Sequence, residues 1–527
     1  MPEDIKYDYD YIIIGSGFGG SVSALRLAEK SYRVLVLEKG KKYTAEDFPK
    51  RNWNVRKWLW VPFLRFFGFF KISFFRNITV LSGVGVGGGS LMYANTLPVP
   101  KKEFFTAESW KHLADWEKEL EPFYTDAKIM LRAVPNPRLE IGDVTLQKLA
   151  GLIGKEAEFE PTEVAVFFGE EDKTVPDPYF EGGGPERAGC NFCGGCMVGC
   201  RYNAKNTLDK NYLYFAQQKS AEIQAESLVY DVQPLGAKNG ADGYKVYWKS
   251  STKFFKRKNV LTCKGIVFAG GVLGTVDLLL KLKKFSLPLL SDRVGSRIRT
   301  NSESLIGITT FDKNTDFSKG IAIGSILHTD KYSHLEPVRY PEGSGFWRIL
   351  MAPMVEGRNV FFRILSVLKD IVFHPVKFLK IYFVNDWAKR TQILLFMQTL
   401  DSTLRFSKSL FGLSSSMEEG KSPTAFIPEA QQLANQYAGL VNAKPTALLT
   451  ETIAGIPTTA HILGGAVMGA NIKEGVIDKD NRVFGYRNMF VCDGSMISAN
   501  PGVNPSLTIT ALAERAMSKI PAKGVDG

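Results

Sequence analysis

The segment YDYIIIGSGFGG, residues 9–20, is the strongest fold signal in this chain. Tyr9 to Ile14 is a short aromatic and β-branched run that predicts a strand, and a glycine-rich turn follows at once. Val22 to Lys30 then predicts a helix, and Arg33 to Leu37 predicts a second strand. This order predicts a βαβ unit of the kind that opens a nucleotide-binding domain.

The glycines of this segment have the spacing of a phosphate-binding turn. Gly15, Gly17 and Gly20 form a GxGxxG pattern, which permits a tight turn and lets a pyrophosphate approach the helix N-terminus. Glu38 closes the second strand, at about the distance where the ribose hydroxyls of an adenosine need an acceptor. We therefore predict a dinucleotide site in preference to a glycine-rich turn without a ligand, although this unit alone does not identify the dinucleotide.

Three later segments extend the same domain. GVGVGGGS, residues 83–90, has enough glycine for the backbone to lie directly against a flat cofactor. Gly265 to Gly274 predicts a strand that ends in a glycine turn and a helix. Val491 to Ser495 predicts another strand and turn, and Leu507 to Lys519 predicts a helix. The cofactor domain is therefore assembled from both ends of the chain.

The middle of the chain has a different pattern. Gly307 to Leu448 contains alternating β-like runs, including Ile393 to Leu400, among basic amphipathic stretches. We therefore predict an α+β protein with two domains. Residues 1–306 together with 449–527 form a Rossmann-like cofactor domain, and residues 307–448 form a substrate domain of a β-sheet plus helices.

Composition narrows the function classes. The 527 residues are 45% hydrophobic and 23% charged, which is typical of a globular protein and excludes disorder as a general state. The N-terminus has no basic region that leads into an apolar run, so we expect a cytoplasmic location. Every long apolar stretch is interrupted before it could span a bilayer. No basic cluster resembles a nucleic-acid-binding module.

The formal net charge of +12 is unevenly distributed. Trp53 to Arg76 holds ten aromatic and five basic residues and no acid. In Arg358 to Arg390, apolar residues recur at helical spacing before Pro375, and basic residues follow: Phe361, Ile364, Leu365 and Leu368, then Lys377, Lys380, Lys389 and Arg390. Aromatic and basic residues together suit the lipid headgroup region, which predicts peripheral contact with a membrane. Amphipathic helices packed on the core remain the alternative.

Four motifs together resemble the glucose-methanol-choline (GMC) oxidoreductases, in their bacterial cholesterol-oxidase-like branch. They are GSGFGG with Glu38, GVGVGGGSLMYAN (residues 83–95), HILGG (residues 461–465) and DGSMISANPGVNPSLTITALAER (residues 493–515). They stand in the family order, and the resemblance is weakest between about 310 and 450. It implies FAD, and we expect it to be noncovalent because no histidine stands in the second motif.

The resemblance also implies roles for individual residues. Gly15, Gly17, Gly20 and Glu38 would hold the ADP half of FAD, with Val232 near the adenine. Gly88, Ser90 and Asn95 would line the flavin, and Asp493 and Gly494 would contact the ribityl chain or pyrophosphate.

His461 and Asn504 would be the catalytic pair. An alcohol gives up a hydride only as its hydroxyl proton is removed, and a neutral imidazole can accept that proton. The amide of Asn504 can polarise the oxygen that becomes a carbonyl. A structural role for His461 is the alternative. Glu303 is a further candidate acid-base group, for which a surface or capping role is at least as plausible.

Four cysteines form a compact run, Cys190, Cys193, Cys196 and Cys200. The C-x2-C-x2-C-x3-C spacing is typical of ferredoxin-type thiolates, and some GMC sugar dehydrogenases resemble this chain in carrying such cysteines. We therefore predict an iron–sulfur cluster, 4Fe-4S or 3Fe-4S. Arg201 stands where the ferredoxin pattern has proline. Zinc, or unligated thiols, are the alternatives.

These observations predict an FAD enzyme that oxidises a hydrophobic, sterol-like or other lipid alcohol and passes electrons through the cluster to an external protein or quinone. One alternative is an oxygen-using cholesterol or alcohol oxidase without a cluster. Others are a reductase that runs the reaction in reverse, and a flavin electron-transfer protein without an alcohol substrate.

Overall fold

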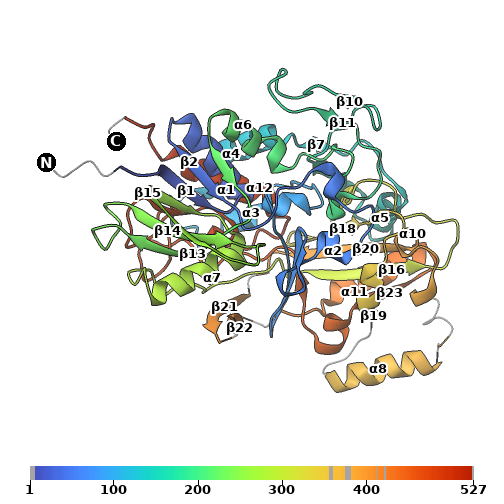
Figure 1. The fold of residues 1–527 in the computed structure, drawn as a ribbon. Helices are drawn as coiled ribbons and strands as arrows, with labels where there is room; N and C mark the ends of the chain where they lie inside the picture. The colour runs from blue at the N-terminus through green and yellow to red at the C-terminus, as the bar shows by residue number, and fades with distance from the viewer. Residues whose placement is uncertain are drawn as a thin grey trace.

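The structure, a computed structural model, describes residues 6–354, 360–373, 375, 381–400, 402–410, 412–420 and 423–524. Two sheets organise these residues, and Figure 1 shows them side by side with helices around them. The fold is α+β with a Rossmann-like domain, as the sequence predicts.

The first sheet has the order β12-β2-β1-β15-β14-β13, with β25 paired to β15. Its strands are β1 (Tyr9–Ile14), β2 (Val34–Leu37), β12 (Glu222–Gln224), β13 (Ser227–Pro234), β14 (Tyr244–Ser250), β15 (Lys258–Phe268) and β25 (Met489–Val491). The five strands around β1 are parallel. β1 and β2 are apolar without alternation because helices cover both faces of a parallel sheet.

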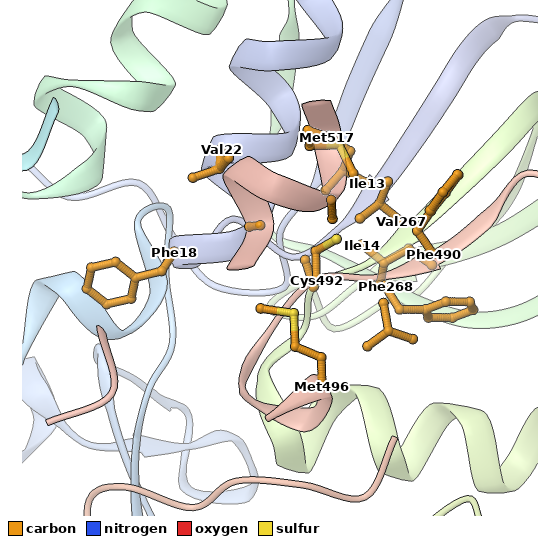
Figure 2. Packing of buried hydrophobic residues seen from close by; sticks show 14 of the residues in the cluster. Ile13, Ile14, Phe18, Val22, Val267, Phe268, Phe490, Cys492, Met496 and Met517 are labelled. Atoms are coloured by element: carbon orange, nitrogen blue, oxygen red, sulfur yellow. The ribbon is translucent and has the colours of Figure 1, made fainter. Parts of the chain in front are cut away.

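Helices from both ends of the chain cover this sheet. α1 (Phe18–Glu29) packs against α12 (Ser506–Ser518) and α6 (Tyr212–Gln218), and α12 packs against α4 (Trp116–Leu131). α7 (Gly271–Lys284) lies below the sheet in Figure 1, on the side opposite these helices. Figure 2 shows Ile13 and Val267 of the sheet beside Met517 of α12, with Val22 of α1 on the other side of Met517. These four side chains are fully buried, and burial of each contributes roughly 1.5–3 kcal/mol.

The second sheet is antiparallel, in the order β19-β23-β16-β20-β18-β17-β8. Its strands are β8 (Phe159–Pro161), β16 (Ser304–Thr310), β17 (Ser325–His328), β18 (Ser333–Val338), β19 (Met351–Pro353), β20 (Thr391–Gln398) and β23 (Ala443–Leu448). α5 (Ile141–Leu152) and α11 (Pro428–Leu440) cover one face. Since β8 and α5 precede residue 307, this layer recruits more of the chain than the predicted substrate domain.

Residues 53–76 do not form a long helix. They form the short helix α2 (Val55–Trp58) and the strands β3 (Trp60–Val61), β4 (Phe66–Phe67) and β5 (Phe70–Phe74). Trp58 and Phe70 are buried in ring contact with each other, whereas Phe63 and Phe74 are exposed. The packed-helix interpretation is therefore wrong for this segment. Its aromatic residues divide between the core and the surface.

The predicted helix around Phe361 is present as α8 (Val360–Phe373). It lies at the bottom of Figure 1, against β19 and residues 450–454. Arg358, Lys377 and Lys380 of the same predicted stretch lie outside the described residues. Among the described residues, no helix combines the length and apolarity needed to cross a membrane.

Candidate active site

Two glycines of the first turn leave no space for a side chain. A Cβ atom on Gly15 would lie 2.3 Å from the carbonyl oxygen of Ala269, and one on Gly20 would lie 2.2 Å from that of Gly15. A Cβ atom on Gly17 would meet no atom within 4 Å, because Gly17 borders a cavity in front of α1. The first N–H groups of α1 therefore point toward open space where an anion could bind.

Glu38 lies beside this turn with its carboxylate fixed. It is 6% exposed and accepts hydrogen bonds from the backbone N–H of Ser16 (3.1 Å), the Ser16 hydroxyl (2.8 Å) and the N–H of Gly40 (2.8 Å). These bonds hold the acid at the end of β2, next to the glycine turn. The structure therefore places the Glu38 carboxylate against Ser16, the residue before Gly17 in the glycine turn.

The second glycine-rich segment packs against the first. A Cβ atom on Gly88 would lie 2.6 Å from the Cα of Gly17, and the Ser90 hydroxyl is held by two backbone groups. Asn95 is buried, and Val232 is buried in β13. None of these four predicted residues borders the cavity. Their neighbours Gly89, Met92, Tyr93, Ala94 and Thr96 do.

Asp493 and Gly494 border the cavity from the C-terminal part of the chain. Asp493 accepts hydrogen bonds from Ser495 (2.8 Å from its N–H) and from the Thr275 hydroxyl (2.5 Å). Burial raises the pKa of Asp493, although these hydrogen bonds oppose the shift. Two glycines that the sequence analysis did not single out, Gly271 and Gly274, also border the cavity with open space at the Cβ position. The glycine turn in GIVFAGGVLG was the signal that could have identified them.

His461, Asn504 and Glu303 meet at the same cavity. The Nδ1 of His461 lies 3.0 Å from a carboxylate oxygen of Glu303, and its Nε2 lies 3.5 Å from the amide nitrogen of Asn504. His461 follows β24 (Thr458–Thr459), which pairs in parallel with β6 (Thr79–Gly83). The Glu303 side chain is 1% exposed and also accepts hydrogen bonds from Thr459 and Ala460. A surface role for Glu303 is therefore wrong.

This geometry sets the protonation of His461. An ionised Glu303 accepts the Nδ1 proton, which leaves Nε2 as the acceptor that faces the cavity. Burial alone lowers the pKa of His461, but the charge and hydrogen bond of Glu303, with a smaller contribution from Glu336, raise the pKa above its usual value. The imidazole is therefore suited to hold a proton taken from a ligand at Nε2.

A second buried acid, Glu451, lies behind this group. It is 2% exposed and accepts a hydrogen bond from the N–H of Thr458 (3.1 Å). Burial, with a smaller contribution from the charge of Glu303, raises the pKa of Glu451 to about 8. No local pattern in the sequence identifies Glu451, because its burial depends on contacts between distant segments.

Beyond the polar group, the cavity wall is apolar. The second sheet supplies Leu305, Val338, Met351, Ile393, Leu395 and Leu448, and the flanking segments add Phe70, Leu81, Met197 and Trp347. Such a wall favours a hydrophobic ligand that has a single polar group in contact with His461 and Asn504.

The four clustered cysteines are free thiols. All four lie in the described part of the chain, where no three or more His, Cys, Asp or Glu side chains are grouped as a metal site would require. Cys193 instead pairs through its backbone with Gly320. Burial raises the pKa of Cys193 to about 12, so its neutral form is favoured. The geometry does not fit the predicted iron–sulfur cluster, and it gives no support to zinc.

A buried cation ties the cysteine loop to the cavity wall. The Nζ of Lys205 donates hydrogen bonds to the carbonyl oxygens of Leu91 (3.2 Å), Tyr93 (2.8 Å) and Cys196 (2.9 Å). It also lies over the ring of Tyr93, 4.6 Å from the centroid. Burial lowers the pKa of Lys205 to about 7. The cysteine loop therefore has a structural link to Tyr93, which borders the cavity.

Comparison with known proteins gives consistent matches. A family model described as GMC oxidoreductase matches residues 398–513, and a model described as NAD(P)-binding Rossmann-like domain matches residues 13–45. The chain is 46% identical to a cholesterol oxidase of Acinetobacter baumannii, over 98% of this chain and 95% of that protein. It is 42% identical to a cholesterol oxidase of Mycobacterium tuberculosis, over 99% of this chain and 92% of that protein.

A solved structure shows the same fold at lower identity. Pyridoxine 4-oxidase from Mesorbium loti superposes with a TM-score of 0.62 at 14% sequence identity. The alignment covers 97% of this chain and 98% of that one.

Proposed function

This chain belongs to the GMC oxidoreductases, in their cholesterol-oxidase-like branch, and we propose that it oxidises the hydroxyl group of a sterol-like alcohol. It is an FAD-dependent alcohol oxidoreductase. The observation that carries the proposal is the position of His461, Glu303 and Asn504 at an otherwise apolar cavity. One polar group on a large apolar ligand is what this arrangement can recognise.

The residues at the other end of the cavity fit FAD. Gly17, Gly271 and Gly274 leave open the space that side chains would fill, in front of the N-terminus of α1. Lys39 and Lys71 border the same cavity, and burial followed by the charge of Lys39 lowers the pKa of Lys71 to about 8. A diphosphate near these two cations would relieve their mutual repulsion.

We assign the predicted residues to FAD in two groups. Gly17, Asp493 and Gly494 would contact it, and Gly15, Gly20 and Gly88 would support that contact by close packing. Glu38 would receive the ribose hydroxyls. Ser90, Asn95 and Val232 remain proposals that would act from behind the cavity wall.

Bound FAD supplies the acceptor for the hydride that leaves the alcohol carbon. His461 accepts the hydroxyl proton at Nε2, and Glu303 holds the opposite ring nitrogen and stabilises the imidazolium. The amide nitrogen of Asn504, 3.5 Å from Nε2 of His461, would donate an N–H to the oxygen that becomes a carbonyl. The apolar wall excludes water and fixes the rest of the substrate.

We propose dioxygen as the electron acceptor. The cysteines do not fit a cluster that would relay electrons, and the two relatives above are named as oxidases. The products would then be a ketone and hydrogen peroxide.

A substrate panel tests this function. The purified, FAD-loaded protein is assayed for peroxide with cholesterol, a long-chain primary alcohol and glucose at equal concentrations. Cholesterol should give the highest kcat/KM, by about tenfold or more over the primary alcohol. Faster turnover of glucose would refute the sterol assignment, and ketone formation that requires a dye in place of oxygen would refute the oxidase assignment.

We further propose that the substrate enters from a lipid bilayer. α8 exposes Phe361, Leu365 and Phe373 beside β19, whose Met351 borders the cavity. Lys369 of the same helix is exposed, so the surface combines aromatic rings with positive charge. We therefore propose that α8 binds an anionic lipid surface.

Sedimentation with phosphatidylserine-containing vesicles tests this surface. Phe361→Ser with Leu365→Ser should reduce the bound fraction several-fold, with unchanged peroxide production from detergent-dispersed cholesterol. Phe254→Ser with Phe255→Ser is a matched control, because these exposed rings lie in the connection between β14 and β15 of the first sheet, whereas α8 contacts the second sheet. If the control variant loses binding and the α8 variant does not, the proposed surface is wrong.

A further inference from the structure

Lys205 carries a buried positive charge that forms no ion pair with an acid among the described residues. The residue is 1% exposed. Its three N–H groups are all used by the backbone carbonyl oxygens of Leu91, Tyr93 and Cys196. These hydrogen bonds satisfy the donors, but they leave the charge without an opposite charge beside it. Buried charges are usually paired, so this one calls for an explanation beyond packing.

The carbonyl oxygens that hold Lys205 belong to two segments of the cavity wall. Leu91 and Tyr93 lie in the second glycine-rich motif, and Cys196 lies in the cysteine loop. Tyr93 itself borders the cavity, and so does Met197, the residue after Cys196. The ammonium group therefore lies directly behind the wall and joins these two segments.

Tyr93 places this charge at the cofactor end of the cavity. The Nζ of Lys205 lies 4.6 Å from the centroid of the Tyr93 ring. The same ring contacts Phe18 edge to face, with 5.5 Å between the ring centroids. Phe18 follows Gly17 in the first glycine turn, and both border the cavity. One aromatic ring therefore separates the ammonium group from the space assigned to FAD.

The protein supplies little negative charge around this ammonium group. Burial lowers the pKa of Lys205 to about 7, although the thiols of Cys196 and Cys200 oppose this shift. Of the remaining charged groups around it, Lys210 lowers the pKa further and Asp209 raises it, and these two form an ion pair with each other at 3.1 Å. Burial also raises the pKa of Cys196, which favours its neutral thiol. Negative charge on a ligand in the cavity would therefore interact favourably with Lys205.

We propose that the ammonium group of Lys205 raises the reduction potential of bound FAD, an inference that deepens the function proposed above and rests on its FAD site. The hydride that leaves the alcohol carbon carries two electrons to the flavin, and the hydroxyl proton goes to His461. Negative charge on the flavin ring therefore appears only after the transfer. A fixed cation behind the wall stabilises that charge and so favours oxidation of the alcohol.

A measurement of the flavin potential tests this role. The purified, FAD-loaded protein is reduced anaerobically with xanthine and xanthine oxidase beside a reference dye at about pH 6, where Lys205 is protonated. In Lys205→Met, the equilibrium constant for reduction of the flavin by the dye should fall about tenfold or more, which corresponds to about 30 mV for a two-electron couple. Flavin content per chain should stay within about twofold of wild type.

Two further variants separate the charge from a structural role. Lys205→Gln keeps N–H donors for the carbonyl oxygens but removes the charge, so its equilibrium constant should also fall about tenfold or more. Lys210→Met is the matched control, because it removes a nearby lysine charge that Asp209 already balances. Its equilibrium constant should stay within about threefold of wild type.

Sulfite titration of the oxidised protein provides a second readout. Addition of sulfite to the flavin also places negative charge on the ring, and it requires neither an alcohol nor dioxygen. Both neutral variants of Lys205 should bind sulfite about tenfold or more weakly than wild type. Lys210→Met should bind it within about threefold of wild type.

The outcomes distinguish this inference from the proposed function. A potential close to that of wild type in both neutral variants overturns the inference. Recovery of the wild-type potential in Lys205→Gln alone also overturns it, because hydrogen bonding would then replace the charge. Loss of flavin from both variants indicates a structural role and overturns it as well. Both measurements omit alcohol, so a wild-type protein that fails to oxidise cholesterol refutes the proposed function alone.

Discussion

The cofactor end of the cavity is formed mainly by backbone atoms, and the substrate end is formed mainly by side chains. The cofactor end is backbone: glycines at Gly15, Gly17 and Gly20 permit contacts that a side chain would block. The substrate end is side chain: His461 and Glu303 form a hydrogen-bonded, titratable pair next to an apolar wall. The comparison indicates that the cofactor end depends on shape and the substrate end on protonation. Substitutions at the two ends should therefore have different signatures.

The largest effect on stability and flavin binding is expected at the cofactor end of the cavity. Gly20→Val would place a side chain against the carbonyl oxygen of Gly15, which should cost more than about 3 kcal/mol and abolish flavin binding. Gly439→Ala is the control, because this helical glycine has open space around it and should gain at most about 1 kcal/mol. Thermal unfolding and flavin absorbance per chain measure both. Normal flavin content in Gly20→Val would contradict the packing argument.

A large loss of activity without loss of cofactor is expected at the side-chain end. His461→Gln removes the proton acceptor, so kcat should fall about 10²- to 10⁴-fold while flavin content stays at the wild-type level. Peroxide production from cholesterol and the visible spectrum provide the two measurements. Activity within tenfold of wild type would show that another group accepts the proton.

A smaller effect with a pH signature is expected for Glu303→Gln. His461 must be neutral to accept a proton, so activity rises as the pH increases through its pKa. Glu303 raises that pKa, and its replacement should move the rising limb of kcat/KM to lower pH and reduce kcat about tenfold. A pH profile from about 5 to 9 tests this shift. If the rising limb of kcat/KM does not move, the measured pKa belongs to a group other than His461.

Stability should respond to pH through Glu451. The pKa of Glu451 is raised to about 8 in the folded protein, compared with 4.5 in the unfolded chain. The protonated acid therefore stabilises the folded state fully below pH 4.5, and this contribution to the free energy of unfolding is lost as the pH rises through 8. Glu451→Gln mimics the protonated acid. It should therefore be more stable than wild type at pH 9, by at most about 5 kcal/mol, and similar to it near pH 4. Chemical unfolding at the two pH values measures the difference, and an equal difference at both would contradict the raised pKa.

The smallest effect is expected in the cysteine loop. Cys193→Ser should change kcat less than about twofold. Iron and acid-labile sulfide analysis of the wild-type protein accompanies this measurement. About four irons per chain, lost in the variant, would restore the cluster interpretation and show that the loop changes its geometry around iron.

Elements that depend on local interactions could be predicted from the sequence, whereas contacts between distant segments could not. β1, α1 and β2 were predicted within a few residues because their apolar periodicity and glycine turn are local. α1 nevertheless begins at Phe18, since the glycines form its first turn. The burial of Glu303 and Glu451 could not be predicted, because it depends on strands far apart in sequence.

Spacing led to a wrong interpretation of the cysteine run, and composition led to an incomplete interpretation of one aromatic run. The cysteine run has the spacing of cluster ligands, but metal binding needs thiols directed to one point, which the backbone of this loop determines. The composition of Trp53 to Arg76 predicts one surface, whereas the short helix α2 places Trp58 in the core and the turn between β3 and β4 places Phe63 in solvent. The number of aromatic residues is clear from the sequence, but the direction of each side chain is not.

The pairing of β25 with β15 has a consequence for synthesis. The parallel strands that hold the nucleotide turn are incomplete until Met489–Val491 and α12 have been translated. At ribosomal rates of about 5–20 residues per second, the apolar edge of β15 waits roughly 10–45 seconds for its last strand. Molecular chaperones would have to shield that edge during this interval. Flavin incorporation would then follow translation of β25 and α12.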